Sequence, residues 1–272
     1  MKDIGVDCIG PAPARVPYRA RYGEGGYSTE MNTGSPTSPA LDRTVALVTG
    51  GSKGIGFAIA KALVSSGASV VITGRDRTDL DRAQAELGSR AHAVEADVRQ
   101  PADVQAAARA PVDRFGGLDV LVNNAGVGLF KNAADMSPAE WQTVIETNLT
   151  GVFSCCHAAI PHLRQRGGGW IINISSLAGN NPFAGGTAYC ASKAGLNAFS
   201  EALMQEVRYD NIRVTCVMPG SVATGFGGRS TADRPDWKIQ PEDVGQLVID
   251  LLQMPTRSLP SRIELRPSRP KK

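Results

Sequence analysis

Tyr189 and Lys193 are the residues whose types and spacing point most directly to chemistry. They lie four positions apart in the run Tyr189-Cys190-Ala191-Ser192-Lys193, so on a helix both side chains project from one face, one turn apart. An ammonium group beside a phenol favours the phenolate and lowers the phenol pKa from its ordinary value of about 10. Tyr189 is therefore a candidate general acid or base for a carbonyl or alcohol oxygen. Such a pair also occurs on solvated helices without a catalytic role, so other motifs must support this interpretation.

A glycine-rich segment lies upstream of this pair, between an expected buried strand and an expected helix. It reads Gly50-Gly51-Ser52-Lys53-Gly54-Ile55-Gly56 and follows the apolar run 44–49. Glycine permits a tight turn and lets the backbone approach a pyrophosphate closely. The helix N-terminus behind the turn presents unpaired N–H groups to an anion. The order of strand, turn and helix favours a dinucleotide site over a plain turn.

The end of the second expected strand predicts the type of cofactor. In NAD sites an acidic residue about 20 positions beyond the glycines binds the ribose 2′-hydroxyl. Here the strand ends at Gly74-Arg75-Asp76, where the Arg75 guanidinium can pair with a 2′-phosphate. Lys53 can add a second positive charge, and Asp76 either faces the ribose or caps the following helix. We predict NADP(H) as the cofactor, with NAD(H) less favoured.

Expected strands and helices alternate along most of the chain. Strands are expected in 44–49, 69–73, 91–95, 118–122, 170–174, 213–217 and 262–265. Helices are expected in about 54–68, 78–87, 103–115, 141–166 with a break near 150–151, 188–208 and 241–253. This alternation is typical of βαβ units. We predict an α/β fold, a doubly wound parallel sheet of the Rossmann type, as one domain over residues 41–272.

Residues 1–40 differ from the rest of the chain. They contain several Pro, Gly and Ser residues without helix or strand periodicity, which predicts a disordered extension. They contain no apolar h-region of the kind found in secretory signals. Because Met31 begins a segment that leads into the expected fold, we expect residues 1–30 to be dispensable for stability and turnover.

The composition excludes several classes of partner. The 272 residues include 29 Lys+Arg and 26 Asp+Glu, a near balance that argues against nucleic acid as the main partner. No apolar run reaches membrane-spanning length. The five cysteines have no metal-binding spacing, so we expect reduced thiols, no metal site and a cytoplasmic protein.

With the glycine turn and the Tyr189–Lys193 pair in this order, residues 44–265 resemble the short-chain dehydrogenase/reductase family, in the branch with subunits of about this length. The segments that carry the resemblance are Thr49-Gly50-Gly51-Ser52-Lys53-Gly54-Ile55-Gly56 for T-G-x-x-x-G-I-G, Asp97-Val98 for the D-V pair, Asn123-Asn124-Ala125-Gly126 for N-N-A-G, and Pro219-Gly220-Ser221-Val222-Ala223-Thr224 for P-G-x-V-x-T.

The resemblance implies a set of site residues. The implied catalytic residues are Asn148, Ser176, Tyr189 and Lys193. In this interpretation Tyr189 exchanges the proton, Ser176 holds the substrate oxygen, and Lys193 acts on both Tyr189 and the nicotinamide ribose. Asn148 holds a relay water through its backbone carbonyl. The implied cofactor contacts are Gly50, Ser52, Lys53, Gly54, Ile55, Gly56, Arg75, Asp97, Val98, Asn124, Ala125, Gly126, Tyr189, Lys193, Pro219, Gly220, Val222 and Thr224.

The expected function is hydride transfer between NADP(H) and a ketone or secondary alcohol, similar to that of a 3-oxoacyl thioester reductase. A homodimer or homotetramer is expected, because helices near 152–163 and 188–207 are apolar on more than one face. Two alternatives stay open: a dinucleotide-binding regulator or scaffold without catalysis, and a dehydratase or epimerase on the same fold. The sequence also departs from the family. The expected substrate lid, 225–238, is polar and glycine-rich, and the end of the chain lacks the common V-D-G-G.

Overall fold

A computed structural model describes residues 41–228 and 235–270 of the chain. The predicted disordered extension, the centre of the predicted lid and the last two residues lie outside the described residues. Within the described part of the chain, no helix is long and apolar enough to cross a membrane.

The core of the fold is a sheet of seven parallel strands, in the order β3-β2-β1-β4-β5-β6-β7. The inner strands are continuous apolar runs, and β1 and β4 are buried along their whole length, as expected for strands covered on both faces. This confirms the predicted doubly wound fold. The strands are β1 Val45–Val48, β2 Ser69–Gly74, β3 Ala91–Glu95, β4 Val120–Asn123, β5 Gly169–Ile174, β6 Ile212–Pro219 and β7 Arg262–Leu265.

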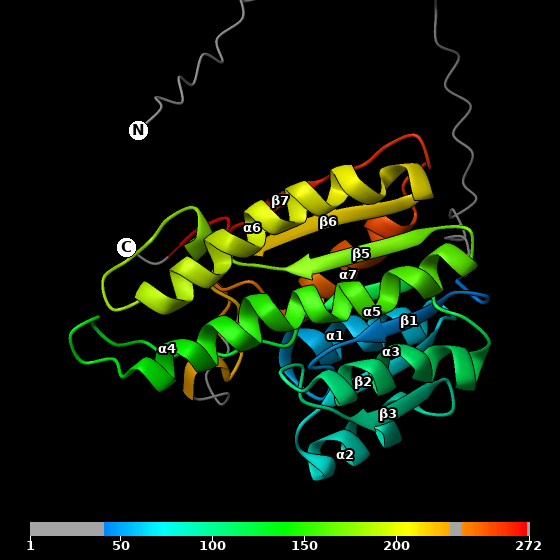
Figure 1. Ribbon diagram of the computed structural model, residues 1–272, viewed down its shortest axis with the longest axis horizontal. Coiled ribbons are helices and arrows are strands. Elements are labelled where there is room, and N and C mark those ends of the chain that lie inside the picture. Colours follow the sequence, from blue (N-terminus) through cyan, green and yellow to red (C-terminus); the bar gives the residue numbers. More distant parts are fainter. Residues whose placement is uncertain (1–40, 229–234, 271–272) are drawn as a thin grey trace, which may run out of the picture. The chain divides into compact units, whose positions relative to one another are not determined.

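Helices cover both faces of the sheet, and each face has its own hydrophobic core (Figure 1). Alternation along β1 shows the division, because Ala46 and Val48 belong to one core and Leu47 to the other. The first core includes apolar residues of α1 Gly54–Ser65, α2 Arg77–Leu87 and α7 Pro241–Leu252. The second includes those of α3 Pro101–Phe115, α5 Gly151–Gln165 and α6 Thr187–Val207.

The helix expected over 141–166 is not broken where the sequence suggested. Helix α4, Pro138–Ile145, continues through a π-helical turn, Glu146–Thr150, directly into α5. Gly151 is helical, and the Val98 side chain fills the space that its own side chain would need. The helix therefore widens for one π-helical turn around Asn148 instead of ending there. Such π-helical turns are frequent at functional sites.

The strand order reverses direction between β1 and β4. In open parallel sheets, loops diverge at such a point and leave a crevice beyond the carboxyl ends of the strands. The glycine turn follows β1, and the loop that contains Asn124 follows β4. The topology therefore brings two of the sequence motifs to one crevice. Short 3₁₀ turns, Leu177–Gly179 after β5, Arg208–Asp210 after α6 and Phe226–Gly228 after β6, complete the fold.

Candidate active site

A cleft of about 1690 Å³ opens at the carboxyl edge of the sheet. Its walls come from the glycine turn, the end of β2, and the loops after β3, β4, β5 and β6, together with the first turns of α6. It brings together all the predicted cofactor and catalytic residues except Gly56 and Asn148, which are buried behind its wall. Residues from nearly opposite ends of the fold, such as Gly50 after β1 and Pro267 after β7, therefore share one cavity, in line with a site for a large ligand.

The glycine turn is shaped for close approach of a ligand. Gly50 and Gly54 have φ angles of 62° and 59°, which L side chains rarely adopt. At Gly56, a Cβ atom would overlap the Gly50 carbonyl oxygen and the Asn124 side chain. Helix α1 begins behind the turn without a side-chain cap, so its first N–H groups stay available to an anion. These features fit the pyrophosphate of a dinucleotide.

Hydrogen bonds join the glycine turn to the loop after β4. The Thr49 hydroxyl accepts from the backbone N–H groups of Asn124 and Ala125, at 3.0 and 3.1 Å. In return, the Asn124 amide donates to the carbonyl oxygens of Thr49 and Gly50, both at 3.0 Å. These bonds hold the two cofactor-facing segments in one fixed arrangement. Thr49 is a positioning residue that the sequence interpretation quoted within a motif but did not include among the site residues.

Asp76 caps the helix that follows β2. Its carboxylate accepts from the backbone N–H of Asp79 at 2.9 Å at the start of α2, and the residue also lines the cleft. Lys53 forms an ion pair with Asp79 at 3.2 Å, and Asp79 also binds Arg82. Arg75 lines the cleft, is exposed, and makes no hydrogen bond or ion pair within the described residues. Arg75 is therefore better placed than Lys53 to meet a new anion.

The carboxylate of Asp97, one of the implied cofactor contacts, already has a partner in the chain. The Arg99 guanidinium donates to both of its oxygens at 2.5 to 3.0 Å. This pairing holds the Asp97 pKa below its usual range. Val98 is buried, and its side chain packs against Gly151 at the π-helical turn. Both residues line the cleft, with the Asp97 charge balanced by Arg99.

Tyr189 and Lys193 lie one turn apart on α6, as their spacing predicted. The Lys193 Nζ atom is 5.9 Å from the centroid of the Tyr189 ring. Lys193 is only 5% exposed, and its Nζ donates to the Ile174 carbonyl at the end of β5, at 2.9 Å. Because burial disfavours the ammonium form, the Lys193 pKa falls to about 8. The helix thus places a poorly solvated cation beside a phenol.

Ser176 lies two residues beyond the end of β5, on the same cleft as Tyr189. Its hydroxyl oxygen accepts from the backbone N–H of Ala178 at 3.1 Å and caps the 3₁₀ turn. The neighbouring Ser175 hydroxyl donates to Asn197 on α6 at 2.6 Å. The segment 175–180, which we call the serine loop, is therefore attached to the helix that contains Tyr189. The hydroxyl groups of Ser176 and Tyr189 are thus held in position relative to each other.

Asn148 acts through its side chain in this structure. The side-chain oxygen accepts from the Val127 N–H at 2.8 Å, and the amide donates to the Val127 carbonyl at 2.9 Å and to Ser192 Oγ at 3.1 Å. Ser192 lies between Tyr189 and Lys193, and its hydroxyl donates to the Tyr189 carbonyl at 2.8 Å. Asn148 therefore links the loop after β4 to the turn of α6 that contains Tyr189 and Lys193. The expected relay role of its backbone carbonyl remains a prediction.

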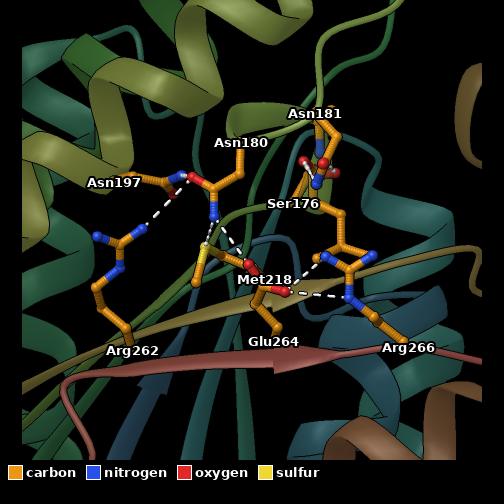
Figure 2. A network of polar contacts seen from close by, with 10 residues as sticks. Ser176, Asn180, Asn181, Asn197, Met218, Arg262, Glu264 and Arg266 are labelled. Atoms are coloured by element: carbon orange, nitrogen blue, oxygen red, sulfur yellow. Dashed lines mark hydrogen bonds and ion pairs between the residues drawn. The ribbon is translucent and has the colours of Figure 1, made fainter.

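A second polar network joins the serine loop to the last strand (Figure 2). The Asn180 amide donates to Glu264 on β7 at 3.0 Å, and its oxygen accepts from Asn197 on α6 at 3.1 Å. Glu264 also accepts from Arg266 at 2.6 Å, and Arg266 lines the cleft. The end of the chain thus contributes to the site although it lacks the common family ending. Sequence analysis missed this network because these residues belong to no motif and come from distant segments.

Three phenylalanines also line the cleft: Phe130, Phe183 and Phe226. Phe226 lies in the expected substrate lid, whereas sequence analysis missed Phe130 and Phe183. Each of the three lies in a loop that follows the carboxyl end of a strand, respectively β4, β5 and β6. That position is the signal that could have identified them, because these loops form the ligand crevice of a doubly wound sheet.

Comparisons with known proteins agree with this geometry. Residues 44–235 match the family model for short chain dehydrogenases. A 3-oxoacyl-(acyl-carrier-protein) reductase of Chlamydia muridarum is 40% identical over 188 residues, covering 68% of this chain and 76% of its own. A metagenomic short-chain oxidoreductase in complex with NADP has a TM-score of 0.74 at 38% identity, covering 85% of this chain and 99% of its own. An alcohol dehydrogenase of the archaeon Thermococcus sibiricus, complexed with 5-hydroxy-NADP, has a TM-score of 0.78 at 30% identity, covering 84% and 99%. The predicted resemblance is confirmed, and the chain belongs to the short-chain dehydrogenase family of oxidoreductases.

Proposed function

We propose that this protein is an NADP(H)-dependent oxidoreductase that interconverts a ketone and a secondary alcohol, as a 3-oxoacyl thioester reductase does. The observation that carries this proposal is the position of Ser176, Tyr189 and Lys193 on one cleft, next to a glycine turn that fits a pyrophosphate. The Chlamydia muridarum reductase and the two solved structures with NADP or its derivative support the same reaction class and cofactor.

The chain's own residues manage the proton and the substrate oxygen. The bound nicotinamide supplies the hydride in reduction and accepts it in oxidation. The Tyr189 hydroxyl donates its proton to the alkoxide oxygen that forms in reduction, and its phenolate accepts the proton in oxidation. The Ser176 hydroxyl donates a hydrogen bond to the same oxygen and fixes its position.

Lys193 supports this proton transfer through its charge. An ammonium group near the phenol favours the phenolate, which lowers the cost of moving the proton. The Lys193 ammonium also donates to the nicotinamide ribose. It has three N–H donors, and one of them is used by the Ile174 carbonyl. Asn148 holds the turn between these two residues through Ser192, and its backbone carbonyl binds the relay water.

The preference for NADP(H) depends mainly on Arg75. Its guanidinium meets the 2′-phosphate in a charge-assisted contact, since Arg75 is exposed at the cleft beyond β2. Lys53 contributes less, because Asp79 balances its charge. The remaining predicted cofactor residues form the cradle around the pyrophosphate, adenine and nicotinamide.

The Tyr189→Phe variant tests the proposal. It removes one oxygen and keeps the ring, so folding and NADPH binding should be retained. Turnover of ketones should fall by roughly 10²–10⁴-fold, the usual contribution of general acid–base catalysis. NADPH oxidation on a panel of ketones, with product analysis, provides the measurement, and fluorescence of bound NADPH provides the binding control.

Three outcomes would contradict the proposal. If Tyr189→Phe retains most of the activity, the proton has another donor. If the wild-type protein binds NADPH but turns over no carbonyl compound, the scaffold alternative is correct. A product that is dehydrated or epimerised instead of reduced would indicate the third interpretation.

A further inference from the structure

Three phenylalanine rings form a continuous row with the ring of Tyr189 at the cleft. The centroid of Phe130 lies 5.5 Å from that of Tyr189, with the ring planes at 73°. The centroid of Phe226 lies 5.7 Å from that of Tyr189, at 53°. Phe183 extends the row, with its centroid 5.9 Å from that of Phe130. We call Phe130, Phe183 and Phe226 the aromatic wall.

The aromatic wall is exposed in a concave site. Phe130, Phe183 and Phe226 are 39%, 49% and 38% exposed, although most large apolar side chains of the described residues are covered. Exposed apolar surface costs free energy, and a cluster of it inside a pocket marks a place that a ligand covers. Because the rings of Phe130 and Phe226 adjoin the phenol that exchanges the proton, the covering group belongs to the part of the substrate next to the reacting carbon.

The backbone holds these rings in place from three different loops. The Phe130 ring lies against Gly227, where a Cβ would be 2.7 Å from the Phe130 ring edge. The Phe183 ring lies equally close to Gly186, 2.7 Å from the position of a Cβ. A β-bridge between Lys131 and Gly186 joins the loops that contain Phe130 and Phe183. The wall is therefore formed before substrate arrives, and little ordering cost remains to be met on binding.

Phenylalanine rings offer faces and edges but no hydrogen bonds. Such surfaces prefer another aromatic ring in a tilted or edge-to-face arrangement, beyond what the buried area alone contributes. A flexible acyl thioester has no ring to place there. We infer that the aromatic wall makes this protein selective for ketones with an aromatic group attached to the carbonyl carbon. This inference rests on the proposed function and specifies its substrate class.

The first test compares three methyl ketones with the full chain and NADPH: acetophenone, cyclohexyl methyl ketone and 2-butanone. The cyclohexyl compound has a similar size without a π system. We expect kcat/KM to be about 3- to 10-fold higher for acetophenone than for the cyclohexyl compound, from aromatic contacts. It should be lower still for 2-butanone, which buries less apolar area.

Variants of the aromatic wall test whether it causes the preference for acetophenone. Phe183→Leu and, separately, Phe226→Leu keep an apolar side chain and remove a ring. Each should reduce the preference for acetophenone over the cyclohexyl compound several-fold. Tyr209→Leu is the matched control, because Tyr209 is 90% exposed and does not line the cleft. Its substrate preference should equal that of the wild-type protein.

A binding measurement separates this inference from the proposed function. Saturation-transfer NMR of acetophenone with Tyr189→Phe and NADP⁺ needs no turnover. Binding that weakens in the Phe183→Leu, Tyr189→Phe double variant supports the wall even if no ketone is reduced, in which case the proposed function alone fails. Reduction of ketones without an aromatic preference overturns the inference and leaves the proposed function standing. If the protein neither reduces ketones nor binds acetophenone, both the inference and the proposed function are wrong.

Discussion

Replacing Lys193 by methionine tests the electrostatic reasoning about the site through protein stability. Lys193 is buried, and its pKa falls from 10.5 to about 8. Between these values the unfolded chain binds more protons than the folded protein, so the free energy of unfolding rises with pH. The full pKa difference corresponds to about 3 kcal/mol of stability. The free energy of unfolding should rise by about 2 kcal/mol between pH 7 and pH 10 from this group.

The methionine side chain of the Lys193→Met variant does not titrate, so the stability of the variant should lack this rise. The variant also leaves the Ile174 carbonyl without its donor, a loss of about 1–3 kcal/mol that does not depend on pH. The stability of Lys193→Met relative to the wild-type protein should therefore decrease by about 2 kcal/mol from pH 7 to pH 10. Titrating groups that do not interact with Lys193 are common to both proteins and cancel.

Urea unfolding at 25 °C, without cofactor and at pH 7, 8.5 and 10, measures this change. Lys61→Met is the matched control, because Lys61 is exposed on α1 and its ion pair with Glu86 raises its pKa. Because the folded pKa of Lys61 lies above 10.5, the contribution of this ion pair is lost only above the measured pH range. The stability difference between Lys61→Met and the wild-type protein should therefore stay nearly constant from pH 7 to pH 10. A stability difference for Lys193→Met that is constant across the three pH values would refute the assignment of a poorly solvated ammonium.

Further predictions concern four other positions. Arg75→Ala should weaken NADPH binding at least several-fold and leave NADH binding nearly unchanged, since a charge-assisted contact contributes about 1.5–3 kcal/mol; equal losses, measured by fluorescence titration, would count against the 2′-phosphate role. Gly56→Ala should impair dinucleotide binding, because its Cβ would overlap the Gly50 carbonyl, and unchanged affinity would show that the turn can shift. Asn180→Leu should lower kcat more than it raises the KM for NADPH, because its contacts with Glu264 and Asn197 position the serine loop; unaltered kinetics would make the network merely structural. Phe153→Asp on α5, where Phe153 is 54% exposed, should shift the expected dimer or tetramer toward monomer in light scattering, and a wild-type monomer at micromolar concentration would exclude the oligomer.

The sequence alone determined the features that depend on local spacing. Tyr189 and Lys193 share a helix face because the α-helical repeat requires it for residues four apart. The glycine turn was predictable because only glycine tolerates its φ angles and close contacts. The parallel sheet followed from buried apolar runs that alternate with amphipathic segments. These inferences need no knowledge of which segments meet in space.

Residues with two local interpretations needed the structure. Asp76 could have faced a ribose or capped a helix, and only the structure shows its cap bond to Asp79. The sequence suggested a break near Gly151, but the chain remains helical because one π turn absorbs the change in register. Lys53 carried a positive charge in either interpretation, yet its pairing with Asp79 depends on how α2 packs beside the turn.

Tertiary structure alone decided which side chains meet across the cleft. Phe130, Phe183 and Phe226 follow three different strands, and no spacing rule relates them. The bond from Asn180 to Glu264 spans 84 positions. Such contacts arise when parallel strands bring the loops at their carboxyl ends to one edge, and strand order depends on the packing of the whole chain. Local sequence patterns therefore predicted the candidate catalytic residues, whereas the walls of the cleft around them depended on the assembled sheet.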